Sequence, residues 1–165
     1  MSIVYDDLME AFAGESQANR KYLAFAKKAD TEGFPQVARL FRAAAAAETI
    51  HALTHFKTAG EIRSTEENLK AAIGGENYEN TVMYPGFIKD AEAEGDAKAM
   101  RSFTWANEAE KIHEMLYKEA LASLGQPGEE FEYYVCPVCG YTHKRSAPEK
   151  CPICDTLGSK FEKIS

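Results

Sequence analysis

Glutamates interrupt the apolar stripes of four predicted helices, and no other feature of the sequence constrains the fold as strongly. On the first helix, for example, the stripe runs through Ala11, Glu15 and Ala18. An ionised carboxylate that is buried without a partner is strongly destabilising. The stripes contain no lysine or arginine that could compensate. We therefore expect a bundle of four helices with metal cations bound in its interior.

Helix start and stop signals place the four helices. Gly33-Phe34-Pro35 ends one helix and begins the next, and Ser64-x-x-Glu67 has the form of a capping box. The expected ranges are 5–31, 35–59, 64–94 and 96–124. Pro85 lies inside the third helix, where it removes a backbone hydrogen bond, so a kink or a π-bulge is expected there.

Two Glu-x-x-His motifs, one on the second helix and one on the fourth, place a carboxylate and an imidazole one turn apart on the same face. Together with single glutamates from the other helices, the candidate ligands are Glu15, Glu48, His51, Glu76, Glu79, Glu110 and His113. A lone Glu-x-x-His is more often a solvated surface pair. Two in register within apolar stripes favour a two-metal site, for which carboxylates and imidazoles suit iron.

The two halves of the helical region also repeat each other. Gly14-Glu15 recurs as Gly75-Glu76, and Ala47-Glu48 recurs as Ala109-Glu110, at offsets of 61 and 62 residues. A duplicated helix pair related by a pseudo-twofold axis would bring the ligands of the two halves face to face.

Three further side chains lie near the candidate ligands on the predicted helices. Tyr22 and Tyr84 are either ordinary core aromatics or hydroxyl donors to the carboxylates. His55, one turn beyond His51, is expected to be a supporting or core histidine rather than a ligand.

All four cysteines lie near the end of the chain, as Cys136-x-x-Cys139 and Cys151-x-x-Cys154. This pairing favours a tetrahedral metal–sulfur site over disulfides or free thiols, and it leaves iron and zinc as alternatives. Residues 125–132 are expected to be a linker. We predict a four-helix domain over 1–130 and a small domain of short strands and turns over 131–165, which needs its metal to fold.

Charge and hydropathy limit the partners. The formal net charge is -7 and the pI is about 5.2, which disfavours nucleic acid and anionic membrane surfaces. The sequence has neither a basic leader nor an apolar stretch of membrane-spanning length, so we expect a cytoplasmic protein.

These motifs resemble the rubrerythrin family along nearly the whole chain. The resemblance is carried by Gly14-Glu15-Ser16-Gln17, the two Glu-x-x-His motifs, the segments 75–79 and 83–85, and the paired Cys-x-x-Cys motifs. It implies a ferritin-like four-helix bundle with two irons, followed by a rubredoxin-like domain with one Fe(Cys)4 iron. It also implies that Glu48 and Glu110 bridge the irons, that one iron exchanges Glu79 for His51 on reduction, and that Tyr22 and Tyr84 donate hydrogen bonds beside the cluster.

The resemblance further implies a peroxidase that reduces hydrogen peroxide to water. Electrons would reach the di-iron pair through the Fe(Cys)4 site from a rubredoxin or an NAD(P)H-dependent reductase, and a head-to-tail homodimer would shorten the path. Two alternatives stay open at this point. One is a ferroxidase with a ferritin-like bundle, and the other is a non-catalytic scaffold with zinc in the cysteine site.

Overall fold

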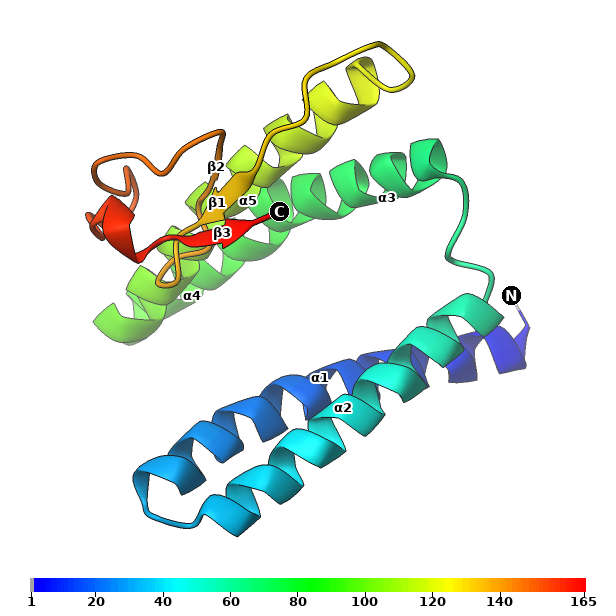
Figure 1. The fold of residues 1–165 in the computed structure, drawn as a ribbon, viewed down its shortest axis with the longest axis vertical. Helices are drawn as coiled ribbons and strands as arrows, with labels where there is room; N and C mark the ends of the chain where they lie inside the picture. The colour runs from blue at the N-terminus through cyan, green and yellow to red at the C-terminus, as the bar shows by residue number, and fades with distance from the viewer. Residues whose placement is uncertain (1) are drawn as a thin grey trace. The chain divides into compact units, whose positions relative to one another are not determined.

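The computed structural model describes residues 2–165 and confirms the predicted fold class, which is mainly helical with four helical segments and a small cysteine-containing sheet domain (Figure 1). The chain divides into a first unit that ends at Arg63 and a second unit that runs from Ser64 to Ser165. The helices are α1 (Ile3–Thr31), α2 (Pro35–Thr58), α3 (Thr65–Tyr78), α4 (Tyr84–Glu94) and α5 (Ala97–Ala122).

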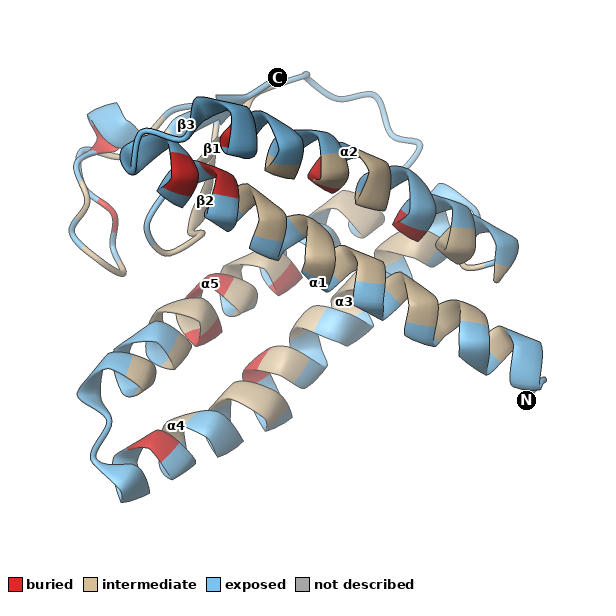
Figure 2. Ribbon diagram, turned by 90° about the horizontal axis from the view of Figure 1, so that it is seen from below, coloured by how far each residue is buried: buried red, intermediate tan, exposed pale blue. Residues whose placement is uncertain are grey.

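The first unit is an antiparallel pair of helices, α1 and α2 (Figure 1). The two helices bury small residues, coloured red in Figure 2, which are Ala26, Ala29, Ala38, Ala45 and Ala52. Alanine at these positions lets the two backbones approach closely. Larger apolar side chains stay exposed, with Leu40 at 67% and Ile50 at 66% exposure. Exposed apolar side chains of this size are typical of a face that packs against a partner.

In the second unit, the predicted third helix is divided into α3 and α4 by a five-residue π-helix, η1 (Glu79–Met83). Ser64 caps α3 in a reciprocal capping box with Glu67, as predicted. At the end of η1 the backbone N–H of Tyr84 donates to the carbonyl of Glu79, which is the i→i+5 bond of a π-turn. The irregularity expected around Pro85 is therefore confirmed as a π-helix.

The π-helix accounts for the unequal offsets of the repeat. In the first unit Tyr22, Phe25 and Phe41 form an aromatic trio, with Phe25 and Phe41 centroids 5.6 Å apart. The second unit has the same trio 62 residues later, formed by Tyr84, Phe87 and Phe103, and the corresponding separation is 5.5 Å. Glu15 and Glu76 differ by only 61 residues. The extra residue thus lies between Glu76 and Tyr84, where η1 is found.

The second unit ends in a three-stranded antiparallel sheet that packs on α5 through β2. Its strands are β1 (Tyr133–Val135), β2 (Thr142–Lys144) and β3 (Glu162–Ile164), in the order β2-β1-β3. A short 3-10 helix, η2 (Gly158–Lys160), precedes β3. The fully buried side chains of this domain are Cys136 and Cys151. Within residues 2–165, no helix has the length and apolar character needed to cross a membrane.

Candidate metal centres

The first unit brings together three of the predicted ligands. Glu15 comes from α1, and Glu48 and His51 come from α2; each offers a ligand atom within 4.8 Å of the others. His51 Nδ1 lies 2.9 Å from Glu48 Oε2 and 3.8 Å from Glu15 Oε1. The Glu48 side chain is 18% exposed and the His51 side chain 53%. One side of this group is therefore open within its own unit.

The second unit repeats this arrangement with Glu76 from α3 and with Glu110 and His113 from α5. His113 Nδ1 lies 2.7 Å from Glu110 Oε2 and 3.8 Å from Glu76 Oε2. These three side chains are between 17% and 25% exposed. The near-identical distances in the two units show that the sequence repeat is also a repeat of the ligand geometry.

Burial and like charge make the second group electrostatically strained without a cation. Burial, followed by the hydrogen bond with Glu110, raises the pKa of Glu76 from 4.5 to about 7. The hydrogen bond from His113 lowers the pKa of Glu110, and the bond with Glu110 in turn raises the pKa of His113. The two carboxylates thus share one proton near neutral pH. Glu76 Oε2 is buried and has no hydrogen-bond partner.

This donor set fits a hard or borderline divalent metal. Two carboxylates and one imidazole nitrogen per unit are the ligand types that suit ferrous iron. A bound cation would supply the partner that Glu76 Oε2 lacks and would displace the shared proton. Each unit offers three such ligands within its own helix pair.

Glu79, at the start of η1, lies near this group but outside its tight cluster. Burial, and then the charge of Glu110, raise the pKa of Glu79. Burial and the same carboxylates also raise the pKa of Tyr84, whose hydroxyl therefore stays protonated. Tyr22 holds the corresponding place in the aromatic trio of the first unit.

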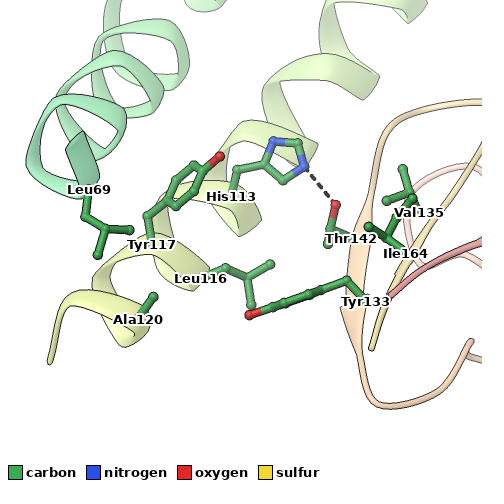
Figure 3. Close-up of a pocket in the computed structure, with 9 residues that line it drawn as sticks. All are labelled: Leu69, His113, Leu116, Tyr117, Ala120, Tyr133, Val135, Thr142 and Ile164. Atoms are coloured by element: carbon green, nitrogen blue, oxygen red, sulfur yellow. Dashed lines mark hydrogen bonds between the residues drawn. The ribbon is translucent and has the colours of Figure 1, made fainter. Parts of the chain in front are cut away.

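Tyr117 is a neighbour of the site that the sequence analysis missed. Burial and the charges of Glu76 and Glu110 raise the pKa of Tyr117. It lines a largely apolar cavity of about 370 Å³ next to His113 (Figure 3). The sequence repeat could have indicated Tyr117, because it follows His113 by one helical turn just as His55 follows His51 in the first half.

All four cysteines converge in the sheet domain without forming a disulfide. Cys136 Sγ lies 3.6 Å from Cys154 Sγ, and Cys139 Sγ lies 3.4 Å from Cys151 Sγ. A tetrahedral site with metal–sulfur bonds of about 2.3 Å has sulfur–sulfur edges of about 3.8 Å. The cysteines are therefore already arranged as tetrathiolate ligands.

The two cysteine loops have the same backbone construction. The N–H of Gly140 donates to the carbonyl of Cys136, and the N–H of Asp155 donates to that of Cys151, at 3.0 Å in both loops. Both residues have positive φ, 82° at Gly140 and 59° at Asp155. Burial opposes ionisation of Cys136, but backbone N–H groups of the loop more than offset it and lower the pKa of its thiol to about 7. The first loop thus favours the thiolate form of Cys136, whereas burial raises the pKa values of Cys139 and Cys151.

His113 connects the two kinds of site within the second unit. Its Nε2 lies 3.1 Å from the carbonyl oxygen of Gly140 and 3.1 Å from Thr142 Oγ1, the contact drawn in Figure 3. Gly140 directly follows Cys139 in the chain. One hydrogen bond therefore joins a candidate iron ligand of α5 to the cysteine loop.

Comparisons with known proteins agree with this arrangement. The family model described as Rubrerythrin matches residues 6–121, and the model of the rubredoxin-like domain of rubrerythrin matches residues 134–162. Nigerythrin of Nitratidesulfovibrio vulgaris is 40% identical over 163 residues, covering 90% of this chain and 80% of the relative. Rubrerythrin-2 of Clostridium acetobutylicum is 36% identical, covering 95% of this chain and 94% of the relative. A solved structure of nigerythrin in a mixed-valence state matches with a TM-score of 0.60 at 38% identity, covering 99% of this chain and 88% of that one.

Proposed function

The chain belongs to the rubrerythrin family of non-haem iron proteins, and we propose that it reduces hydrogen peroxide to water at a di-iron site, with electrons supplied through its tetracysteine iron. The observation that carries the proposal is the duplicated Glu–Glu–His group, present once in each unit with matching distances and linked through His113 to the cysteine loop. The cytoplasm, as a reducing compartment, would keep the cysteines available for metal.

We propose that the two helix pairs pack against each other, within one chain or between two chains of a homodimer. The exposed apolar side chains of the first unit, such as Leu40 and Ile50, support this pairing because burying them is favourable. It would combine both groups with Glu79 into one ligand set, with Glu48 and Glu110 as the carboxylates able to bridge two metals. These residues would hold two ferrous ions, which would supply Lewis acidity and the two electrons needed to convert hydrogen peroxide and two protons into two waters.

The residues around the site have separable tasks in this proposal. Tyr84 remains a hydroxyl donor beside the carboxylates, because its raised pKa keeps it protonated. His113 is oriented by the Gly140 carbonyl and Thr142, which fixes Nε2 as the donor and leaves Nδ1 for a metal. Nothing among the described contacts fixes Nε2 of His51 in the same way, so this imidazole is the freer of the two to change its position.

Electrons would enter at the cysteines and reach the bundle site through the Cys139–Gly140 backbone and the hydrogen bond to His113. The donor upstream would be a rubredoxin or an NAD(P)H-dependent reductase.

Peroxide oxidation of the reduced, iron-loaded protein tests the function. The protein is reduced without oxygen, peroxide is added, and the return of the ferric–thiolate absorption is followed. We expect rapid return in the wild type and a large loss of rate in Glu110→Ala. The matched control is Glu108→Ala on the same helix, because the Glu108 side chain is 46% exposed and is paired with Lys111. A protein that turns over free ferrous iron but not peroxide with a reduced donor would instead be a ferroxidase, and colourless protein with zinc in both sites would be a scaffold.

A further inference from the structure

Glu114 is a buried carboxylate on α5 that does not belong to either metal group. It is 9% exposed and accepts three hydrogen bonds within the second unit. Asn77 Nδ2 donates to its Oε1 at 3.0 Å, Asn80 Nδ2 donates to its Oε2 at 2.7 Å, and Lys118 Nζ lies 2.5 Å from Oε1. A buried carboxylate is costly unless it is bonded in this way, so these three bonds offset the cost of burying Glu114.

The hydrogen bonds around Glu114 contact the first turn of the π-helix. Asn80 is the second residue of η1 and is itself only 8% exposed. Its side-chain amide donates both to Glu114 and, at 2.8 Å, to the backbone carbonyl of Glu76. One side chain thus joins the inserted turn to a candidate ligand residue of α3 and to α5. Glu79, the extra carboxylate of the site, is the residue immediately before it.

The corresponding helix pair of the first unit lacks this cluster. Under the 62-residue offset, Ala52 stands where Glu114 stands in the second half. Asn19, the counterpart of Asn80 at the 61-residue offset, donates to the carbonyl of Ala45 and to Thr49 Oγ1 instead. α1 is a continuous α-helix at this point and carries no counterpart of Glu79. The buried carboxylate therefore occurs in the half that has the inserted turn.

We propose that Glu114, through Asn77 and Asn80, is a positioning residue that holds η1 in its π-helical form and so directs Glu79 toward the metal site. A π-turn is less favourable than the α-helix that could replace it, so it persists where tertiary contacts hold it. The three donors on Glu114 supply such contacts. The part of the proposal that concerns Glu79 rests on the proposed function, whereas the part that concerns η1 does not.

Hydrogen exchange in the metal-free protein tests the hold on η1. Glu114→Gln keeps the size of the side chain but removes its charge and one acceptor, so amides of residues 79–84 should exchange roughly ten- to a hundredfold faster. Asn77→Ala, at an exposed position, removes one donor and should give a smaller increase in the same segment. Asn19→Ala, which breaks the corresponding bond in the first unit, should leave residues 79–84 unchanged. Unchanged exchange in Glu114→Gln, or an increase spread evenly over α3, α4 and α5, would overturn the proposal.

A double-mutant cycle tests the effect on Glu79. Iron content and the near-ultraviolet absorption of the oxidised protein are measured for Glu79→Gln, for Glu114→Gln and for both together. If Glu114 acts through Glu79, the double variant should match Glu79→Gln. Additive changes would show that Glu114 acts independently and would refute the positioning role. Failure of the wild-type protein to bind a pair of irons would defeat the proposed function but would leave the exchange result standing.

Discussion

Metal binding at the carboxylate–histidine site should weaken as the pH falls below 7, because the metal must displace a proton from Glu76. The pKa of this carboxyl is raised to about 7, so at pH 8 it is mostly ionised and at pH 6 mostly protonated. A competing proton with this pKa lowers the apparent affinity about tenfold between pH 8 and pH 6, equivalent to about 1.4 kcal/mol. The raised pKa of His113 acts in the same direction.

Calorimetric titration with ferrous iron, without oxygen, measures this effect directly. The tetracysteine site is loaded beforehand so that its own protons do not contribute. Repeating the titration in buffers of different ionisation enthalpy gives the number of protons released. At pH 6, wild-type protein should release about one proton more than Glu76→Gln, whose amide carries no titrating proton. The Glu108→Gln control should release as many as the wild type.

The metal-free protein provides an independent check on the same proton. Because the folded pKa of Glu76 is above its ordinary value of 4.5, the stabilising contribution of the protonated form is complete below that value and is lost as the pH rises through about 7. Glu76→Gln should remove this loss. An iron affinity that stays constant from pH 8 to pH 6, together with equal proton release by Glu76→Gln and wild type, would show that the two carboxylates do not share a proton.

Three further substitutions have outcomes that the structure fixes. Thr156 Oγ1 lies 3.1 Å from Cys154 Sγ. Because a hydrogen bond to a thiolate stabilises the reduced iron site, Thr156→Val should lower the reduction potential of the tetracysteine iron. The expected change is about 40 mV, the one-electron equivalent of about 1 kcal/mol. Spectroelectrochemistry should find Thr156→Ser close to wild type, and an unchanged potential in Thr156→Val would contradict the assignment. A Cβ at Gly158 would lie 1.7 Å from the carbonyl oxygen of Pro148, so Gly158→Ala should lower the free energy of unfolding by about 1–3 kcal/mol. Iron release in guanidinium measures this loss. Gly128→Ala is the control, because a Cβ there meets nothing within 4 Å. Ser64→Ala removes the capping box of α3 and should cost about 1 kcal/mol in the free energy of unfolding, whereas Ser64→Thr should retain most of it, and equal losses in both would argue against the cap.

Local sequence rules predicted the helix boundaries well because each rule concerns neighbouring residues. Pro35 begins α2 after Gly33, which has a φ of +81°, and the Ser64 cap forms as its motif indicates. The two ligand groups could be predicted from the sequence as well, because an i, i+3 spacing on a helix fixes which side chains share a face. The cysteine site followed from spacing alone. In each of these features the residues that interact are close in sequence or belong to a strongly specific motif.

The features that the sequence analysis did not find depend on contacts between distant segments. No periodicity on α5 indicates that His113 meets the carbonyl of Gly140, because that contact depends on how the sheet domain packs against the helix. Glu114 was hidden for a different reason. It stands four residues before Lys118, and such a pair ordinarily lies on a solvated helix surface. Its burial is visible only once Asn77 and Asn80 are placed opposite it.

The π-helix could be predicted only in part from the sequence. It also explains why the second half of the repeat carries a carboxylate, Glu79, that the first half lacks. Offsets of 61 residues at Glu76 and 62 at Tyr84 require one inserted residue between them, and the amino-acid sequence is enough to imply this insertion. The same offsets do not say whether the insertion forms a loop, shifts the rest of the helix or widens one turn. Here the aromatic trio keeps its centroid separations beyond the insertion, so the helix presents the same face to its neighbour on both sides of the inserted residue. The added residue is absorbed in a single wide turn, and Glu79 is carried by that turn.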